Sequence, residues 1–185
     1  EGHALKGVLK ADMENIRSTM EKIDYNTFED VVNNIFAAKR IYIIGLRSSM
    51  ALAEFLGFYL NIILQNVKTV GYGISDIFEQ MINVGEGDLV IGIGFPRYAS
   101  RTIDALAFAQ DRGATVVAVT DSFLSPLAAR ADYSLIAQSN MASFVDSLVA
   151  PLSVINALII AVGMREKENI SSTFNSLEEI WREYN

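Results

Sequence analysis

Short runs of β-branched and apolar residues alternate with helical patterns along most of this chain. The runs are RIYIIG, VKTVG, GDLVIGIG, ATVVAVT and DYSLIA, each closed by a glycine, threonine or alanine. Apolar residues at helical spacing fill the stretches between and after them, at 49–65, 74–83, 99–112, 125–130 and 142–165. This alternation predicts an α/β fold of parallel βαβ units with right-handed crossovers. Because the strands are apolar on both faces, we expect a doubly wound, five-stranded parallel sheet with helices on both sides.

Helical spacing continues outside this region. It predicts helices at 4–22 and 27–38, and a final amphipathic helix that begins near Ser172. The chain has 185 residues, no internal repeat and no low-complexity linker, so we expect one domain. Its opening residues, EGHALKG, are typical of an excised fragment with a tag-derived start. We therefore divide the chain into an N-terminal helix on the dimer or linker side, 1–26, and the domain itself, 27–185.

The charge balance and the missing residue types exclude several functions. Lys and Arg total 15 against 22 Asp and Glu, a formal net charge of -7, which leaves no basic stripe for gripping nucleic acid directly. There is no cysteine, and His3, the only histidine, lies in the tag-like start. Thiol catalysis, a Ser/His triad and most transition-metal sites are therefore excluded, and we predict no catalytic residue, no metal and no cofactor. Glu54, Glu79 and Asp146 remain candidate bases, but each lies in a helical pattern typical of a solvated or interface residue.

The segment 142–164 is long and largely apolar, but polar residues interrupt it. Its longest uninterrupted apolar stretch, ALIIAVGM, is far shorter than the ~20 residues that span a bilayer. We therefore expect no membrane partner, and interpret the segment as a helix buried in the core or at a subunit interface. Together with the N-terminal helices it offers more apolar face than one small sheet needs, which predicts a homodimer or a higher homo-oligomer. The lack of cysteine is compatible with a cytoplasmic location.

A candidate anion site lies in IGLRSSM, residues 44–50, where a predicted strand passes through a glycine turn into a helix. The first N–H groups of a helix have no backbone partner, and the helix dipole favours an anion there. Gly45 permits a tight turn, while Ser48 and Ser49 offer hydroxyl and N–H groups. Arg47 can clamp two oxygens of a phosphate or carboxylate. The alternative is that Ser48 only caps the helix while Arg47 points to solvent.

The loop IGFPRYASRT, residues 93–102, repeats this pattern after the third predicted strand. Its candidate ligand residues are Gly94, Arg97, Tyr98, Ser100 and Thr102. If the strand order is 2-1-3-4-5, the first and third strands flank the switch point of the sheet, so the two loops face one another. Two arginine-bearing loops at one switch point favour an anion site there. The alternative is structural, with Ser100 capping the helix and Arg101 pairing with Asp104 on its surface.

Polar residues also follow the fourth and fifth predicted strands. Asp121 could hydrogen-bond a sugar hydroxyl, or it could cap the following short helix through Ser125. Gln138, Ser139 and Asn140 form a neutral hydrogen-bonding set that suits a polyol, although loops also use such residues for turns. We include Asp121 and Ser139 in the candidate ligand site.

These motifs together resemble the sugar isomerase (SIS) domain. The similarity covers about residues 27–165 and is most specific in RGATVVAVTDSFLSPLAARADYSLIA. In particular, the chain resembles the phosphosugar-sensing half of MurR/RpiR-type bacterial transcription regulators. This resemblance implies a flavodoxin-like fold that dimerises, binds a sugar phosphate at the two loops and, in the regulators, follows an N-terminal helix-turn-helix domain. DNA would then be contacted only through that missing domain.

The resemblance also assigns site residues and exposes a departure from the family pattern. Gly45, Ser48 and Ser49 match the first phosphate-binding loop. The second loop of SIS enzymes is typically a serine- and threonine-rich SxSGxT turn. In this chain its place is taken by Gly94, Pro96, Arg97 and Ala99. With Arg47 and Arg97 as charged clamps, the ligand stays open among a sugar phosphate, a sugar acid and another small anion.

Three functions remain open at this point. The leading hypothesis is the effector-binding domain of a bacterial transcription regulator, which senses a phosphorylated sugar or related anion without catalysis. The second is a sugar-phosphate aldose-ketose isomerase with a carboxylate as its base. The third is a module that only dimerises and has a vestigial pocket.

Overall fold

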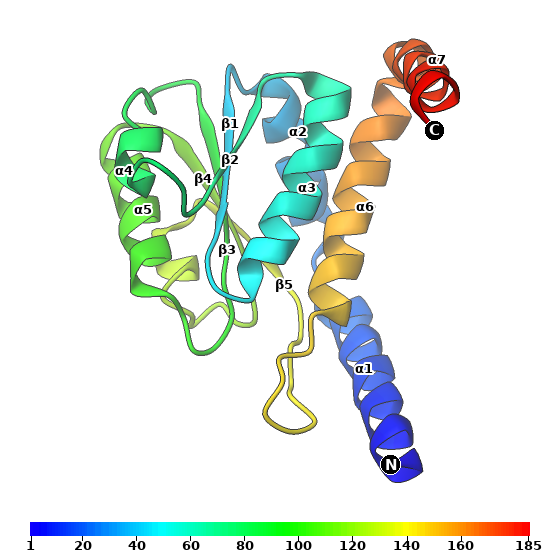
Figure 1. Ribbon diagram of the computed structural model, residues 1–185. Coiled ribbons are helices and arrows are strands. Elements are labelled where there is room, and N and C mark those ends of the chain that lie inside the picture. Colours follow the sequence, from blue (N-terminus) through cyan, green and yellow to red (C-terminus); the bar gives the residue numbers. More distant parts are fainter.

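A five-stranded parallel sheet with the strand order β2-β1-β3-β4-β5 forms the centre of the molecule (Figure 1). The computed structural model describes residues 1–185, apart from the side chain of Asn169. The strands are β1 (Ile41–Gly45), β2 (Val67–Val70), β3 (Leu89–Ile93), β4 (Thr115–Thr120) and β5 (Tyr133–Ile136). The predicted doubly wound α/β fold is therefore confirmed, and the switch point lies between β1 and β3 as expected.

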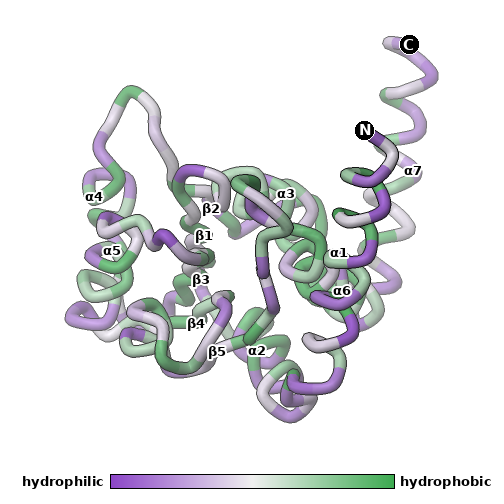
Figure 2. Tube along the Cα trace, turned by 90° about the horizontal axis from the view of Figure 1, so that it is seen from below, coloured by the Kyte–Doolittle hydropathy of each residue, from purple (hydrophilic) through white to green (hydrophobic). Residues whose placement is uncertain are grey.

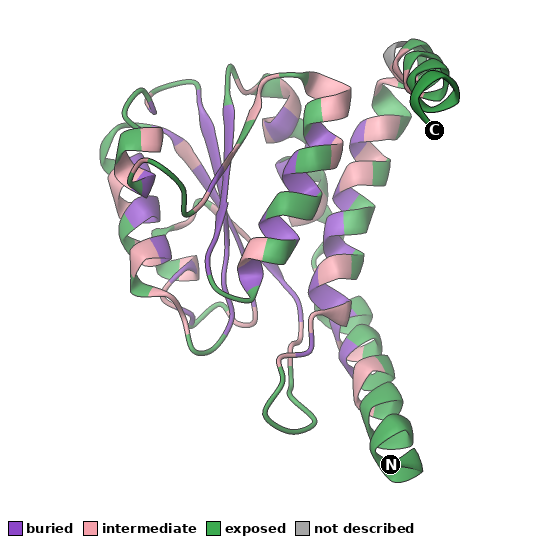
Figure 3. Cartoon of the chain, viewed as in Figure 1, coloured by how far each residue is buried: buried purple, intermediate pink, exposed green. Residues whose placement is uncertain are grey.

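Helices cover both faces of the sheet. One face carries α2 (Tyr25–Ala37), α3 (Ser49–Leu64) and α6 (Val149–Arg165), and the other carries α4 (Ile77–Gln80), α5 (Ser100–Asp111) and the 3₁₀ helix η1 (Ala128–Arg130) (Figure 1). Successive strand residues point to opposite faces. Ile41 and Ile43 of β1 therefore pack with α2, α3 and α6, whereas Tyr42 and Ile44 pack in the layer of α4 and α5. The strands are consequently buried on both sides (Figure 3).

Two terminal helices extend beyond this sandwich. The N-terminal half of α1 (Gly2–Lys22) runs away from the sheet, and α7 (Lys167–Tyr184) turns off the end of α6 (Figures 1 and 2). The exposed large apolar side chains of α1 are Leu5, Val8, Leu9, Met13, Ile16 and Met20. Among the described residues no single helix is long and apolar enough to cross a membrane, although α6 and part of α7, bent by 110°, together pass that test by length and composition.

Three predicted helices differ from the structure in their limits. The helix expected at 74–83 is the single turn α4, because Asp76 and Glu79 fix its start by capping each other's backbone N–H groups. Residues 142–148 do not form a helix, since their polar side chains bond to other elements, and α6 begins only after them. The last helix, α7, begins five residues before Ser172, directly after the end of α6.

Gly45 allows β1 to approach α3 closely. A Cβ atom at this position would lie 2.6 Å from the carbonyl oxygen of Ser49 and 3.2 Å from the Cβ of Ala53. The first of these is well inside van der Waals contact with a backbone atom, which cannot rotate away as a flexible side chain can. Any side chain at position 45 therefore separates the end of β1 from the first turn of α3.

We predict that Gly45→Ala lowers the free energy of unfolding by about 1–3 kcal/mol, because the added methyl group overpacks this junction. Urea denaturation followed by circular dichroism measures the change. The matched control is Gly73→Ala, since a Cβ at Gly73 meets no atom within 4 Å, and this variant should stay within about 0.5 kcal/mol of the wild type. Equal stability of the two variants would contradict the packing role of Gly45.

Candidate functional site

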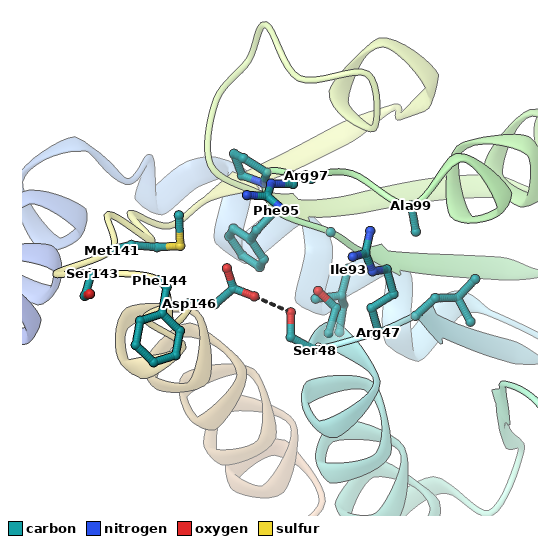
Figure 4. Close-up of a pocket in the computed structure, with 14 residues that line it drawn as sticks. Arg47, Ser48, Ile93, Phe95, Arg97, Ala99, Met141, Ser143, Phe144 and Asp146 are labelled. Carbon is teal, nitrogen blue, oxygen red and sulfur yellow. Dashed lines mark hydrogen bonds between the residues drawn. The ribbon is translucent and has the colours of Figure 1, made fainter.

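The loops that follow β1 and β3 line one cavity of about 400 Å³ at the carboxyl edge of the sheet (Figure 4). A third wall comes from the segment between β5 and α6. The lining residues are Leu46, Arg47, Ser48, Ser49, Ile93, Gly94, Phe95, Pro96, Arg97, Ala99, Met141, Ser143, Phe144 and Asp146. The sheet register explains the first two walls, because Gly45 of β1 pairs with Ile93 of β3. The two predicted loops therefore face one another, as the strand order requires.

The first loop leaves β1 through a left-handed turn. Arg47 has a φ of 58°, a conformation that costs a non-glycine residue about 1–3 kcal/mol and is concentrated at functional sites. The Ser49 amide is not open to a ligand as expected, because it donates to the carbonyl oxygen of Leu46 at 3.2 Å. Ser48 makes no capping bond, so the alternative role as a helix cap is wrong for its side chain. Its hydroxyl instead donates to Oδ2 of Asp146 at 2.6 Å.

Positive charge exceeds negative charge on the cavity wall. Arg47 and Arg97 are both exposed and both line the cavity (Figure 4). Neither guanidinium has a hydrogen-bond or ion-pair partner among the described residues. The lining set holds one carboxylate, that of Asp146. A chain with a formal net charge of -7 thus keeps two unpaired cations at one opening, an arrangement that attracts an anion.

Tyr98 of the second loop and Asp121 after β4 do not line the cavity but hydrogen-bond to each other. The Tyr98 hydroxyl donates to Oδ1 of Asp121 at 2.6 Å. Burial, together with this hydrogen bond and the carboxylate charge, raises the pKa of the Tyr98 hydroxyl well above its ordinary value. Asp121 does not cap the following turn. Ser125 does so itself, accepting from the amide of Ala128 at 3.1 Å.

Comparison with known proteins agrees with this geometry. Residues 34–161 match the model of the SIS domain. The chain belongs to the SIS domain family. The SIS domain of an RpiR transcription factor from Sphaerobacter thermophilus is 31% identical, with a TM-score of 0.88, over 93% of this chain and 96% of that one. The predicted resemblance to the ligand-sensing half of RpiR-type regulators is therefore confirmed at the level of family.

Two further relatives carry additional information. An uncharacterised helix-turn-helix-type transcriptional regulator from Haemophilus influenzae is 28% identical over 85% of this chain, which spans 55% of that protein. The structure of Vibrio vulnificus NanR complexed with ManNAc-6P has a TM-score of 0.79 and 17% identity, and the match covers 94% of this chain and 67% of that one. The SIS fold seen here therefore also occurs in a protein solved with a sugar phosphate.

Besides Gly45, Tyr98 and Asp121, three more predicted site residues lie outside the cavity lining of this SIS domain. Ser100 is exposed at the start of α5 and makes no capping bond, so neither of its expected roles is seen. Thr102 is 1% exposed, and its hydroxyl has no hydrogen-bond partner among the described residues. Ser139 is half-buried in the segment after β5. Arg101 pairs with Asp76 of the α4 cap, so the expected surface pair with Asp104 is wrong.

The candidate carboxylate bases lie in three different environments. Glu79 accepts from the amide of Asp76 at 3.1 Å as part of the α4 cap. Glu54 lies on α3, outside the cavity lining. Asp146, which we expected in a helical pattern on a solvated or interface face, lies in a loop and lines the cavity. Its hydrogen bond to Ser48 holds it there.

The third wall was missed because its residues continue the apolar pattern of α6. Phe144 and Asp146 fall inside the helix predicted from 142 onward, and Met141 directly precedes it. Pro151 was the available signal, since proline is tolerated in the first turn of a helix and disfavoured beyond it. It is the third residue of α6. A helix predicted to begin near Pro151 would leave residues 142–148 as a loop at the carboxyl edge of the sheet, next to the two other loops of the cavity.

We predict that Tyr98→Phe lowers the free energy of unfolding by about 1 kcal/mol at pH 7, because one partly buried hydrogen bond is lost. The raised pKa of Tyr98 means that the folded state keeps the phenol proton when the unfolded state begins to release it. The difference between wild type and variant should therefore be constant below pH ~10 and shrink above it. Urea denaturation at several pH values measures this difference. A gap that widens above pH ~10 would contradict the assignment.

Proposed function

We propose that this SIS domain is the effector-binding domain of a cytoplasmic bacterial transcription regulator, and that its cavity binds a phosphorylated sugar or a related small anion. The observation that carries the proposal is the pair of unpartnered guanidinium groups, Arg47 and Arg97, on two loops of one cavity. Guanidinium groups bind phosphate and carboxylate oxygens bidentately. At about 400 Å³ the cavity is within the ordinary range for small-molecule sites.

Each part of the cavity suits a different part of such a ligand. Arg47 and Arg97 would pair with the anionic group, and Ser48 at the start of α3 would donate to it, where the helix dipole also favours negative charge. The segment with Ser143 and Asp146 would face the sugar hydroxyl groups, which both donate and accept hydrogen bonds. NanR, with its ManNAc-6P complex, supports a sugar phosphate over other anions.

A sensing role agrees better with the cavity than sugar-phosphate isomerisation does. Asp146 is the one carboxylate in the described lining set, and it could serve as a base in an aldose-ketose isomerase. It already accepts a hydrogen bond from Ser48, however, and the described lining residues include no second carboxylate and no histidine, lysine or tyrosine. The regulator relatives support the same choice. Contact with DNA would then belong to a helix-turn-helix domain outside this chain.

A homodimer is part of the proposal. The exposed apolar residues of α1 form one stripe at helical spacing, and an apolar groove between α1, α2 and α6 continues it. A stripe of this kind is stable in water when another chain covers it. We propose that a second copy of the domain does so.

We predict that sugar phosphates stabilise the wild-type domain in a thermal-shift screen that includes inorganic phosphate, sugar acids and ManNAc-6P. A ligand at a hundred times its dissociation constant adds about 2.7 kcal/mol, or about 5–11 °C for a domain of this size. Arg47→Ala and Arg97→Ala should each weaken binding about ten- to a hundredfold, because each removes charged hydrogen bonds.

Arg130→Ala is the matched control for these variants. Arg130 is exposed on η1 and does not line the cavity, so its replacement should leave the dissociation constant within about twofold. Unchanged affinity in both Arg47→Ala and Arg97→Ala would refute the site. Turnover of a sugar phosphate by the purified domain would refute the non-catalytic role.

We predict that the domain sediments as a dimer and that Leu9→Glu or Met13→Glu weakens the dimer at least about tenfold, because a charge would enter the apolar stripe. Leu9 and Met13 are 53% and 69% exposed in the single chain. Lys10→Glu changes a neighbouring exposed residue on α1 and should not affect association. A wild-type monomer at all concentrations, or equal effects of Lys10→Glu and Leu9→Glu, would contradict the proposed interface.

A further inference from the structure

Residues 138–148 join β5 to α6 and lie beside α1 (Figure 1), and we name them the bridging segment. On one side the segment forms the third wall of the cavity through residues such as Ser143 and Asp146. On its other side, polar groups bond to α1. The segment is thus the direct physical connection between the proposed ligand site and the N-terminal helix.

The α1 side of this connection is built from three polar residues on one helix face. Asp12, Asn15 and Thr19 are spaced by three and four residues, which places them on one face of the helix. Asn15 is 2% exposed and Thr19 is 6% exposed. Polar side chains as deeply buried as these need hydrogen-bond partners, and the bridging segment supplies them.

The hydrogen bonds between the two elements lie at the two ends of the segment. The Asn15 amide group donates to the carbonyl oxygen of Asn140 at 3.0 Å and accepts from its backbone N–H at 3.3 Å. The Thr19 hydroxyl accepts from the backbone N–H of Gln138 at 2.9 Å. At the other end of the segment, the Ser147 hydroxyl donates to Oδ1 of Asp12 at 2.6 Å.

Two consecutive residues hold the two ends of the connection. Asp146 accepts a hydrogen bond from the Ser48 hydroxyl inside the cavity, and the Ser147 hydroxyl donates one to Asp12 on α1. A displacement of the Asp146 backbone must therefore move Ser147. The exposed residues beside them give little resistance, since Phe144 is 90% exposed and Val145 is 61% exposed.

An anion in the cavity competes with Asp146. The Ser48 hydroxyl has a single proton with which to donate a hydrogen bond, and the Asp146 carboxylate accepts that bond. A phosphate oxygen that accepts this proton must replace the carboxylate oxygen, and the two negative groups repel each other at such short range. Arg47 and Arg97 favour the phosphate in this exchange, since neither is paired with Asp146.

We propose that the bridging segment relays cavity occupancy to α1: an anion displaces Asp146 from Ser48, and the movement weakens the bond between Ser147 and Asp12. The relay rests on the proposed function, since it needs an anion in the cavity. In the relay, the chain's own carboxylate and the ligand's anion compete for the same Ser48 hydroxyl. Ligand binding then loosens α1, the helix with the proposed dimer stripe.

Hydrogen exchange of the α1 amides, with and without inorganic phosphate, tests the relay, while calorimetry measures phosphate binding separately. In the wild type, saturating phosphate should speed exchange over residues 10–20 by about threefold or more, because a bond that restrains α1 is weakened. Ser147→Ala should bind phosphate at least as tightly as the wild type, since coupling is reciprocal. Its α1 exchange should no longer respond to phosphate.

Asp12→Asn removes the charge from the other partner of the same bond and should reduce the response in the same way. The matched control is Ser153→Ala, whose hydroxyl bonds the carbonyl oxygen of Val149 within α6, and it should keep the full phosphate response. A response of wild-type size in Ser147→Ala, or weaker phosphate binding by that variant, would overturn the relay. Phosphate binding by the wild type without any change in α1 exchange would overturn it too.

Asp146→Asn tests the competition directly. The variant keeps the shape of the side chain but removes its charge, so phosphate should bind about fivefold more tightly than to the wild type. Unchanged or weaker binding would refute the competition between Asp146 and the anion. No phosphate binding by the wild type, together with no binding of any sugar phosphate in calorimetry, would instead refute the proposed function and the relay with it.

Discussion

The parallel pairing of β1 with β3 is the constraint on which the site depends. Because these strands lie side by side and their crossovers run in opposite directions, their carboxyl ends meet at the switch point of the sheet. Gly45 and Ile93 are register partners, so the loops that follow them lie side by side and line one cavity. The two apolar layers that bury β1 on both faces hold this register in place.

The groups that the cavity offers to an anion differ from those of a loop rich in hydroxyl groups. The second loop lacks the serines and threonines of the family pattern, and the amide of Ser49 is already used within the first turn. Two guanidinium groups supply the attraction instead, in a chain that is acidic as a whole. One of them, Arg47, is held in a left-handed conformation, a local cost of the kind that ligand sites commonly carry.

The fold and the two central loops could be predicted from the sequence because their signals are local. Short apolar runs for the strands, a helical period between them and a glycine at the end of the first and third runs are read within a few residues. Side-chain direction is not read in this way, which is why Tyr98, Ser100 and Thr102 were placed in the site although none lines the cavity. The bond between Tyr98 and Asp121, 23 residues apart, was equally invisible.

The third wall could not be predicted because tertiary contacts override its local pattern. Residues 142–148 have helix-like periodicity, yet Asp146 and Ser147 find partners 98 and 135 residues away in sequence. Contacts over such separations depend on where α1 and α3 lie after the sheet has formed. Pro151 is the one local sequence signal for the start of α6. It marks where the helix begins but does not indicate which residues bind the segment 142–148.

The most direct measurement of the central claim is a crystal structure of the wild-type domain grown with a sugar phosphate that binds it in solution. We expect the phosphate group between the guanidinium groups of Arg47 and Arg97, within hydrogen-bond distance of Ser48, with the Asp146 carboxylate moved away from that hydroxyl. A phosphate bound elsewhere on the molecule, with both arginines free and the bond between Asp146 and Ser48 intact, would contradict the account.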